Sequence, residues 1–457
     1  MMKKRLAFAK YGFSVEDDHG NILLFNALHG TKSFCKITCK DFENINDDIR
    51  MDKLYSTTEN SIVKGLIKKG IIISEDVDEE GRLSRIFLDT VADKKLNLII
   101  SPTEKCNLRC QYCCESFEYG EMPETVIDGI VKYIESRIRD VSSVNIDWFG
   151  GEPLLALDTI LELSERVIRL CKENRKPYSA FMSTNGLLLT ADVFKKLYQA
   201  HVFTYQVTLD VTRELHDSQR VDKHGNPTFD RILANLMDIK NTNYGKFSTI
   251  VILSNFSTDM FGKIKEYKRF FSDRFGDDKR FAFSCFRILD LGGERIDKFR
   301  PKLMTDGKEM NRIYKEIIEC KDYKLRFVIP EFFKPGGLLC YAAKENSFLV
   351  GSNGDVFKCE HTFQIRRDQP IGHITKEGKM VLSQEKADLW LARYMFCGNH
   401  DCKFVPLCLG EDCIENRIYG VSKPGNPCIN RLCHFDKETV HYAMKIMDSE
   451  MNAFPML

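Results

Sequence analysis

From about residue 93 to residue 310, short apolar runs alternate with longer stretches whose apolar residues recur at helical spacing. Short apolar runs bounded by turn residues favour buried strands, and the amphipathic stretches favour helices. Such alternation is typical of βα units and predicts a parallel sheet in an α/β fold. The expected strands are residues 96–101, 144–149, 178–183, 204–210, 248–254 and 281–287. Six units are too few for a closed eight-stranded barrel, so we predict an open, partial (βα)6 barrel.

Two of the expected strands carry polar residues at every second position. Thr208 and Asp210 flank the apolar Leu209, and Asn145 and Asp147 alternate with apolar residues in the same way. Because neighbouring side chains of a strand point to opposite faces, the apolar residues are expected against the helices and the polar ones inside the barrel. Buried polar groups without partners are costly, so a polar interior indicates a polar ligand.

The N-terminal region has a different pattern. Two apolar runs, Leu6–Ala9 and Asn21–Phe25, lie on either side of a polar turn and predict a hairpin. A helix beginning near Thr58 is expected to end at Gly70, and the apolar residues after it predict a short returning strand. This set of elements predicts a winged-helix-like α+β domain.

At 457 residues the chain exceeds one typical domain, and we expect three. Their expected limits are 1–92, 93–310 and 311–457, with the charged stretch 75–85 as a linker. Lys and Arg number 67 and Asp and Glu 66, so the net charge of +1 gives no reason to expect a nucleic acid or membrane partner. The sequence shows neither a signal peptide nor a stretch of transmembrane length, so a cytoplasmic location is expected.

The 17 cysteines are clustered, with four between residues 106 and 114 and eight between 340 and 433. Clustering in a reducing compartment indicates metal binding rather than disulfides. The first cluster contains Cys106, Cys110 and Cys113 in a C-x3-C-x2-C pattern, directly after the first expected strand. Three thiolates can hold three irons of a cubane cluster and leave the fourth iron open to a small molecule, whereas ordinary four-iron carriers use four cysteines. A zinc site is the alternative, although it usually takes paired C-x2-C ligands.

Polar motifs also follow the next three expected strands, at the end where such barrels carry their chemistry. They are Gly150-Gly151-Glu152-Pro153, Ser183-Thr184-Asn185-Gly186 and the Thr208-Leu209-Asp210 segment. In this order, the cysteine loop and these motifs resemble the radical S-adenosylmethionine (SAM) enzymes. In that family, SAM binds the open iron of a [4Fe-4S] cluster through its methionyl amine and carboxylate.

The resemblance implies where SAM lies. Gly150 and Gly151 are expected to let the backbone approach the methionyl group, with Glu152 near its amine. Thr208 and Asp210 match ribose-binding positions, although the family usually has Gly where this chain has Val211. The remaining expected SAM contacts are Tyr112 against the adenine, Arg220 toward a carboxylate, and Ser183 and Asn185 after the third strand.

The C-terminal cysteines resemble the SPASM extension of radical SAM enzymes, which carries auxiliary four-iron clusters. Cys340 and Cys359 bracket the turn residues Asn353-Gly354-Asp355, so a hairpin can bring the two cysteines together. The resemblance implies two auxiliary [4Fe-4S] clusters, the first on Cys340, Cys359 and Cys413 and the second on Cys397, Cys402, Cys408 and Cys428, with Cys433 as a competitor. The spacings of the later cysteines depart from the family's, and two zinc sites are the alternative.

The first auxiliary set has no further cysteine between Tyr341 and Asn346, where the complete family pattern has one. One iron is therefore expected to be free to take a substrate thiolate, unless Cys433 or His361 completes the cluster. No catalytic acid or base can be assigned from the sequence.

The resemblance implies a peptide maturase that acts through a 5′-deoxyadenosyl radical. Its expected substrate is a ribosomally synthesised, Cys-containing precursor whose leader binds residues 1–92. The expected product is a sulfur-to-carbon thioether of the sactipeptide or ranthipeptide type. Reducing electrons would come from an external donor such as flavodoxin or ferredoxin. The alternatives are carbon–carbon crosslinking, anaerobic sulfatase-type maturation and, remotely, a non-catalytic iron–sulfur scaffold or electron carrier.

Overall fold

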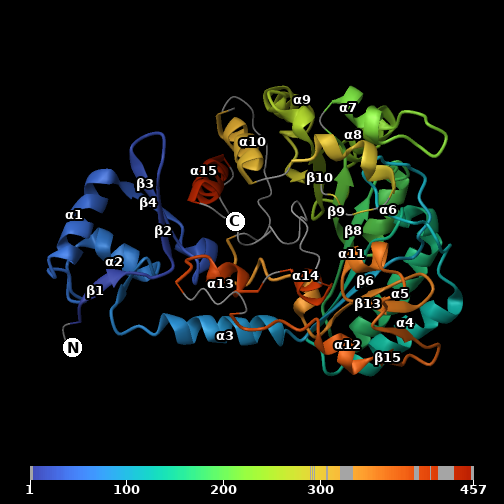
Figure 1. Cartoon of the computed structure of the whole chain (residues 1–457), viewed down its shortest axis with the longest axis horizontal. Coiled ribbons are helices and arrows are strands. Elements are labelled where there is room, and N and C mark those ends of the chain that lie inside the picture. Colours follow the sequence, from blue (N-terminus) through green and yellow to red (C-terminus); the bar gives the residue numbers. More distant parts are fainter. Residues whose placement is uncertain are drawn as a thin grey trace.

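The fold is that of a computed structural model, which describes residues 4–210, 212–288, 290, 292, 294–304, 307–319, 333–395, 401–411, 413–419 and 437–453. Along the chain it forms an N-terminal α+β unit, a barrel of parallel strands with outer helices, and a C-terminal region of short strands and helices (Figure 1). None of the described helices is long and apolar enough to cross a membrane.

The barrel strands are β6 (Lys95–Ile100), β7 (Ser143–Trp148), β8 (Tyr178–Thr184), β9 (Val202–Thr208), β10 (Thr249–Phe256) and β11 (Phe281–Arg287). They pair in parallel in chain order, from β6 at one side to β11 at an end of the sheet. The open six-stranded barrel and all six expected strands are therefore confirmed. The helices that follow the strands are α4 (Glu124–Arg137), α5 (Leu157–Glu173), α6 (Ala191–Gln199), α7 (Arg213–Gln219), α8 (Phe229–Lys240), α9 (Ile264–Phe275) and α10 (Gly307–Glu319).

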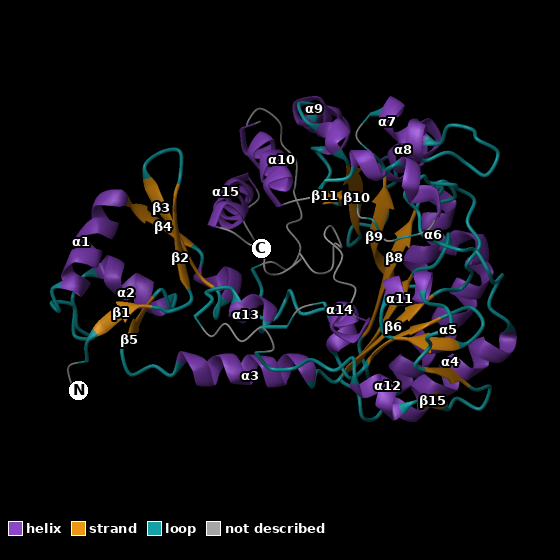
Figure 2. Ribbon diagram, in the orientation of Figure 1, coloured by secondary structure: helices purple, strands orange, loops and turns teal. Residues whose placement is uncertain are grey.

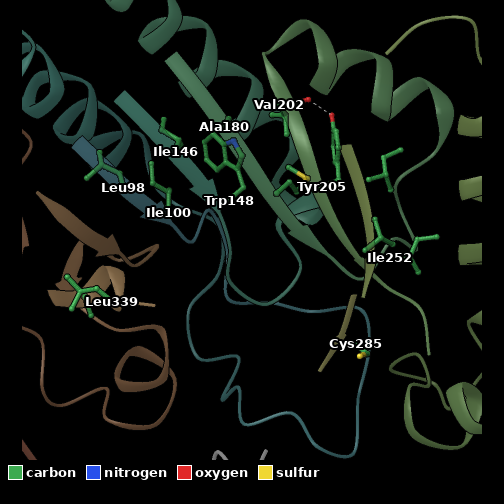
Figure 3. Close-up of a cluster of buried hydrophobic side chains, with 14 of the residues drawn as sticks. Leu98, Ile100, Ile146, Trp148, Ala180, Val202, Tyr205, Ile252, Cys285 and Leu339 are labelled. Atoms are coloured by element: carbon green, nitrogen blue, oxygen red, sulfur yellow. Dashed lines mark hydrogen bonds between the residues drawn. The ribbon is translucent and has the colours of Figure 1, made fainter. Parts of the chain in front are cut away.

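The expected alternation along the strands is also present. Val144 and Ile146 of β7 are fully buried in the main hydrophobic core, together with Leu98, Val202 and Ile252 of neighbouring strands (Figure 3). The alternating residues of the same strands face the barrel interior. Many of them are polar and partly exposed, such as Asn97, Gln206 and Asn255, whereas Ile99 and Phe181 are apolar. The helices thus cover the apolar face of the sheet, and the polar face encloses the interior.

The barrel sheet continues into the C-terminal region, which the sequence did not predict. Strand β12 (Ser347–Val350) pairs in parallel with β6, and β13 (Asp355–Phe357), β14 (Gly372–Ile374) and β15 (Met380–Leu382) extend the sheet in antiparallel order. Gly354 has a φ of +89° in the turn between β12 and β13, which suits a residue without Cβ. The hairpin expected at Asn353-Gly354-Asp355 is confirmed.

The N-terminal unit contains β1 (Leu6–Phe8), β2 (Gly12–Glu16), β3 (Asn21–Asn26), β4 (Cys35–Thr38), α1 (Cys39–Arg50), α2 (Ser61–Lys68), β5 (Ile72–Ser74) and α3 (Glu79–Val91). The hairpin turn is where the sequence indicated, but β2 rather than Leu6–Ala9 pairs with β3, and β1 pairs with the returning strand β5. The stretch 75–85, which we expected as a linker, contains the first part of helix α3, which runs from the N-terminal unit toward the barrel (Figure 1). Helix α3 begins at Glu79 because Asp78 caps it through its carboxylate, which accepts a hydrogen bond from the Gly81 amide.

The sheet of β2, β3 and β4 lies between two hydrophobic cores. Ile22 and Leu24 of β3 pack into the core of the N-terminal unit, whereas Leu23 and Phe25 pack into the main core. The Phe25 ring centroid is 4.9 Å from that of Phe333, in edge-to-face geometry. The N-terminal unit therefore rests on the C-terminal region through an apolar face and is not an independent appendage.

The remaining helices are short except for the last. They are α11 (Glu360–Ile365), α12 (Gln384–Asp388), α13 (Val405–Cys408), α14 (Ile414–Tyr419) and α15 (Lys437–Ala453), with 3-10 turns at Gly30–Ser33, Pro153–Ala156, Thr258–Met260, Glu294–Lys298, Arg300–Lys302 and Tyr341–Ala343. Helix α15 packs against α10 and contacts β3. Figure 2 shows α13 and α14 between the N-terminal sheet and the barrel.

Candidate active site

The loop after β6 that carries the first three cysteines is held by the segment after α7. The Arg109 amide donates to the Val221 carbonyl at 2.8 Å and the Gln111 amide to the Gln219 carbonyl at 2.9 Å. The Lys223 amide donates in return to the Asn107 carbonyl at 2.9 Å. Paired backbone groups on both sides fix the loop in one conformation at the end of the barrel, and they bring Arg220 next to it.

The three cysteines of this loop are poorly solvated and lie close to one another. Cys110 is buried, and burial raises the pKa of the Cys106 and Cys113 thiols to about 12 in each case. Arg220 and Arg295 lie close enough to Cys110 to favour its thiolate electrostatically. Iron supplies the further positive charge that ligation by three thiolates requires.

A single zinc ion would fit this loop less well than a cluster. Within the described part of the chain, no group of three or more Cys, His, Asp and Glu side chains is gathered as one metal ion needs. A cubane cluster spreads its cysteines over different irons, so it does not require them to converge on one point. Cys106, Cys110 and Cys113 therefore fit a cluster of this kind. Cys114 has a different partner, because its thiol donates a hydrogen bond to Gln364 Oε1 at 3.0 Å.

The two glycines after β7 let their loop lie directly on the cysteine loop. Gly150 has a φ of +117°, and a Cβ added there would lie 2.5 Å from the Thr103 carbonyl oxygen. A Cβ on Gly151 would come equally close to the Lys105 carbonyl oxygen, also at 2.5 Å. Contact between these two loops, besides any approach to SAM, therefore requires glycine at both positions.

Glu152 joins the loops that follow β7 and β8. Its carboxylate is fully buried and accepts hydrogen bonds from Thr184 Oγ1 at 2.7 Å and from the Asn185 amide at 2.8 Å. Asn185 in turn donates from Nδ2 to Asn107 Oδ1 of the cysteine loop at 2.7 Å. Glu152 and Asn185 thus lie together beside the cysteines, as the sequence motifs indicated, while Ser183 is half-buried near the end of β8.

Asp210 is held in the same region after β9. Its buried carboxylate accepts hydrogen bonds from Gln219 Nε2 at 2.7 Å and from the Asn255 amide at 2.9 Å. Nδ1 of the buried His216 accepts a hydrogen bond from the Asp210 amide nitrogen at 3.2 Å. Burial lowers the pKa of His216 to about 2, so this imidazole is neutral and serves as an acceptor. Thr208 ends β9 as a half-buried residue, and Val211 lies outside the described residues.

Arg220 lies between the cysteine loop and Asp210. Its Nη1 donates to the Tyr112 hydroxyl at 2.7 Å, and Asn255 Nδ2 donates to the same hydroxyl at 3.0 Å. Among the residues that the structure describes, the Nε of this buried guanidinium finds no hydrogen-bond partner. A buried donor of this kind needs an acceptor, and a guanidinium prefers a carboxylate. The orphaned Nε thus fits the methionyl carboxylate of SAM.

The polar interior of the barrel contains a hydrogen-bonded row across β6, β7 and β8. Asn145 Nδ2 donates to Asn97 Oδ1 at 2.6 Å and to Asp147 Oδ1 at 2.7 Å. Ser179 Oγ donates to Asn145 Oδ1 at 2.7 Å. Burial raises the pKa of Asp147. The expected inward direction of Asn145 and Asp147 is therefore confirmed, and their own bonds offset part of the cost of burying them.

The C-terminal cysteines fall into two groups. Cys340 and Cys359 lie at the two ends of the β12–β13 hairpin and influence each other electrostatically. Cys413 directly precedes α14, whose Glu415 pairs with His361 Nδ1 of α11, two residues after Cys359. His361 is therefore engaged by a carboxylate.

Cys402 lies three residues before α13, and Cys408 is the last residue of this helix. Phe404, between them, contacts the ring of Phe13 in β2 at a centroid distance of 5.1 Å. Cys397, Cys428 and Cys433, which the sequence also indicated, lie outside the described residues.

Sequence reasoning missed the side chains that connect the two cysteine regions. Arg367 forms a salt bridge with the buried Glu104 at 2.5 Å, and Gln364 Nε2 donates to Glu115 Oε1 at 2.8 Å. The sequence gave no signal for these pairs, because their members are about 250 residues apart. Asn255 was also missed, although it follows an expected strand just as the predicted site residues do.

The fold and this site together define a class. Residues 100–267 match the family model described as the Radical SAM superfamily. These residues form a radical SAM domain, and the chain is a radical SAM enzyme whose cofactors are a [4Fe-4S] cluster and SAM.

The chain is similar in sequence and in fold to several known proteins. It is 24% identical over 380 residues to the serine-type anaerobic sulfatase-maturating enzyme of Bacteroides thetaiotaomicron, which covers 74% of this chain and 87% of that protein. It is 28% identical over 345 residues to the cysteine-type enzyme of Clostridium novyi, covering 69% of this chain and 87% of that protein. The solved structure of anSMEcpe with bound AdoMet and the Cp18Cys peptide shares the fold, with a TM-score of 0.58 at 19% identity. That match covers 79% of this chain and 99% of the solved chain.

Proposed function

We propose that this enzyme modifies a ribosomally synthesised, Cys-containing precursor peptide and joins Cys sulfur atoms to carbon atoms as thioether crosslinks. The observation that carries the proposal is the grouping of Cys340 and Cys359 at one hairpin, beside the segment that begins with Cys413. Three thiolates on a four-iron cluster leave one iron for a substrate thiolate. Such an iron lowers the pKa of the thiol and fixes its sulfur.

The side chains of the barrel have separate tasks in this proposal. The SAM-bound cluster supplies the radical that removes a hydrogen atom from the peptide carbon. Arg220 and Asp210 orient SAM, with Glu152 and Tyr112 holding the surrounding loops in place. The row through Asn145 and Asp147 offers donors and acceptors to a peptide that enters the interior. As the sulfur–carbon bond forms, the thiol loses its proton and one electron would pass to the auxiliary cluster proposed on Cys340, Cys359 and Cys413. The electron that cleavage of SAM consumes would come from an external donor such as flavodoxin or ferredoxin.

Another four-iron cluster is proposed on the second set of cysteines. This set comprises Cys402, Cys408 and Cys397, with Cys428 or Cys433 as the fourth ligand. Phe404, between Cys402 and Cys408, packs on β2, so this cluster would lie next to the N-terminal sheet. Two zinc sites remain the competing assignment. Iron and zinc analysis of anaerobically purified protein separates the two, since the proposal requires three four-iron clusters per chain and no bound zinc.

The N-terminal sheet is proposed to bind the leader of the precursor by adding a strand to β2. Strand β2 is at an edge of its sheet, and Ser14 and Glu16 are exposed there. Toward β3, the Asp17 amide donates to the Asn21 carbonyl, and the Tyr11 carbonyl accepts from the Ala27 amide. Backbone groups of an antiparallel strand point to its partner at every second residue, so the Ser14 and Glu16 amides face away from β3. These outward amides can pair with an extended peptide.

A proline at the edge tests this docking without removing the domain. Ser14→Pro deletes one outward amide and leaves the β2–β3 hydrogen bonds intact, which an edge strand tolerates. We expect it to weaken precursor binding about tenfold, the effect of one or two lost backbone bonds of about 1 kcal/mol each. Ser14→Ala is the matched control and should bind as the wild type does. Equal affinity of all three proteins, measured by fluorescence anisotropy with a labelled leader, contradicts strand addition at β2.

A second candidate function is sulfatase-type maturation, which the names of the two relatives favour. Mass spectrometry discriminates the candidates after anaerobic reaction with the precursor encoded nearest to the enzyme and with a Cys-containing sulfatase peptide. A thioether product loses two hydrogen atoms, resists thiol alkylation and fragments as a crosslink. Modification of only the sulfatase peptide, without a crosslink, supports the second candidate and contradicts the first.

A further inference from the structure

A buried lysine lies between the β13 strand and the adjacent cysteine. Lys358 follows Phe357, the last residue of β13, and directly precedes Cys359. Its exposed fraction is 2%, whereas almost all lysines of folded proteins keep the ammonium group in water. The hairpin therefore holds an amino group inside the C-terminal region, where burial lowers its pKa to about 7.

The contacts of this ammonium group are few. Its Nζ donates a hydrogen bond to the Lys344 carbonyl at 2.5 Å and lies 4.7 Å from the centre of the Phe348 ring. Within the described ranges of the chain, no carboxylate forms an ion pair with it. The nearest acidic groups that act on it electrostatically are Cys340 and Glu345, and Glu345 is exposed to solvent, which screens its charge.

One carbonyl and one ring face compensate a buried ammonium group only in part. An ammonium ion taken out of water loses several kcal/mol of hydration, and only a closely placed anion recovers most of it. Cys340, which acts on the ammonium electrostatically, and Cys359, next to it in the chain, supply the missing anion when they bind a cluster as thiolates. Nearby charge is one of the features that set the reduction potential of an iron–sulfur cluster.

We propose that Lys358 is the counter-charge of the iron–sulfur cluster bound by Cys340 and Cys359 and raises the reduction potential of that cluster. This inference rests on the proposed auxiliary cluster. A fixed cation favours the form of the cluster with one more electron, because reduction adds negative charge beside it. Lys358 is therefore a positioning and tuning residue, since it acts on the cluster electrostatically and does not bind the peptide.

The test removes the charge while keeping the length of the side chain. Lys358→Met and Lys358→Arg are compared in the full-length, anaerobically reconstituted enzyme, with Lys176→Met as a matched control. Lys176 donates from Nζ to the Val141 carbonyl at 2.6 Å and is half-buried in the barrel, so its replacement removes the same kind of bond away from the proposed cluster ligands. The readout is an EPR-monitored redox titration of the signal that disappears in a Cys359→Ala variant.

At the wild-type midpoint potential, the reduced-to-oxidised ratio of this signal should fall about tenfold in Lys358→Met, which is about 59 mV for one electron. Lys358→Arg and Lys176→Met should keep the wild-type ratio, and the signal that responds to SAM should not move in any variant. A wild-type ratio in Lys358→Met with full iron content overturns the role of Lys358 but keeps the auxiliary cluster. If the Cys359→Ala variant shows the same EPR signals as the wild type, the auxiliary cluster itself is overturned.

Discussion

The guanidinium of Arg220 donates a hydrogen bond to the hydroxyl of Tyr112 at 2.7 Å and so joins two segments that are far apart in the sequence. Tyr112 lies between Cys110 and Cys113, and Arg220 lies within the segment from Gln219 to Lys223 that pairs with the cysteine loop. The position of the cysteine loop and the position of the Arg220 guanidinium are therefore not independent.

The first prediction concerns this bond. Tyr112→Phe leaves the ring in place but removes the acceptor of Arg220 and Asn255, so the guanidinium loses its fixed orientation. We expect SAM affinity to fall about five- to tenfold, consistent with one lost charge-assisted bond of about 1–1.5 kcal/mol. Anaerobic equilibrium dialysis with labelled SAM measures the affinity. Tyr244→Phe is the matched control, because its hydroxyl donates to the Ala191 carbonyl away from the site. Equal losses in the two variants would refute the specific role of Tyr112.

The second prediction concerns the cysteines themselves. Replacing Cys106, Cys110 and Cys113 by Ala should abolish the production of 5′-deoxyadenosine, because no cluster remains to bind and reduce SAM. Cys114→Ala is the internal control, since the thiol of Cys114 is bonded to Gln364. This control should retain at least half of the wild-type rate in a chromatographic assay with dithionite as reductant. Persistent production in the triple variant would contradict the cluster assignment.

The third prediction is a pH dependence of stability. The pKa of His216 is lowered by burial to about 2 in the folded state, against about 6.5 in an unfolded chain. Below pH 6.5 the unfolded chain therefore binds a proton that the folded protein does not, and the free energy of unfolding falls as the pH is lowered. The expected loss from this group is up to about 1.4 kcal/mol per pH unit.

His216→Gln removes this titration and keeps a polar side chain near the Asp210 amide. Urea unfolding of the metal-free protein at pH 7 and pH 5 should show a smaller decrease in the midpoint concentration for the variant than for the wild type. Its stability at pH 7 should be lower, because the hydrogen bond between Asp210 and His216 is imperfectly replaced. An identical decrease in both proteins would show that other groups account for the acid sensitivity.

The fourth prediction concerns the barrel interior. Asp147→Asn keeps the shape of the side chain but removes its charge and one acceptor. We expect peptide modification to fall at least tenfold, while SAM cleavage without peptide stays within a factor of two of the wild type, because Asp147 does not contact the SAM-site residues described above. Both rates are measured by mass spectrometry and chromatography on the same samples. A parallel decline of the two rates would instead indicate a general structural defect.

The sequence predicted the parts of the fold that depend on local patterns. Residues 281–287 are a strand in both the prediction and the structure, because an apolar run bounded by turns specifies a strand locally. The sequence did not predict β12 beside β6, since the pairing of distant edges depends on tertiary geometry. It also missed the α3 helix, whose charged first turn conceals the apolar spacing that begins at Leu83.

The same division holds for the candidate site. Glu152 and Asp210 could be identified because each follows a strand at the functional end of the barrel. The partners of Asp210 could not be identified, because Gln219 and His216 both belong to α7, and only the return of that helix over the barrel brings them to Asp210. The separation of two residues in the sequence does not predict which side chains hydrogen-bond to the site residues.

The pairing of β6 with β12 determines when the barrel can be completed during synthesis. Strand β6 receives β7 on one side early, but its other edge stays unpaired until residues 347–350 have left the ribosome. Contacts at a separation of about 250 residues form late and slowly in folding, and an open edge meanwhile invites association with other chains. The nascent barrel therefore depends on the last third of the chain for protection, and a stop before residue 347 should yield aggregates rather than a smaller active enzyme.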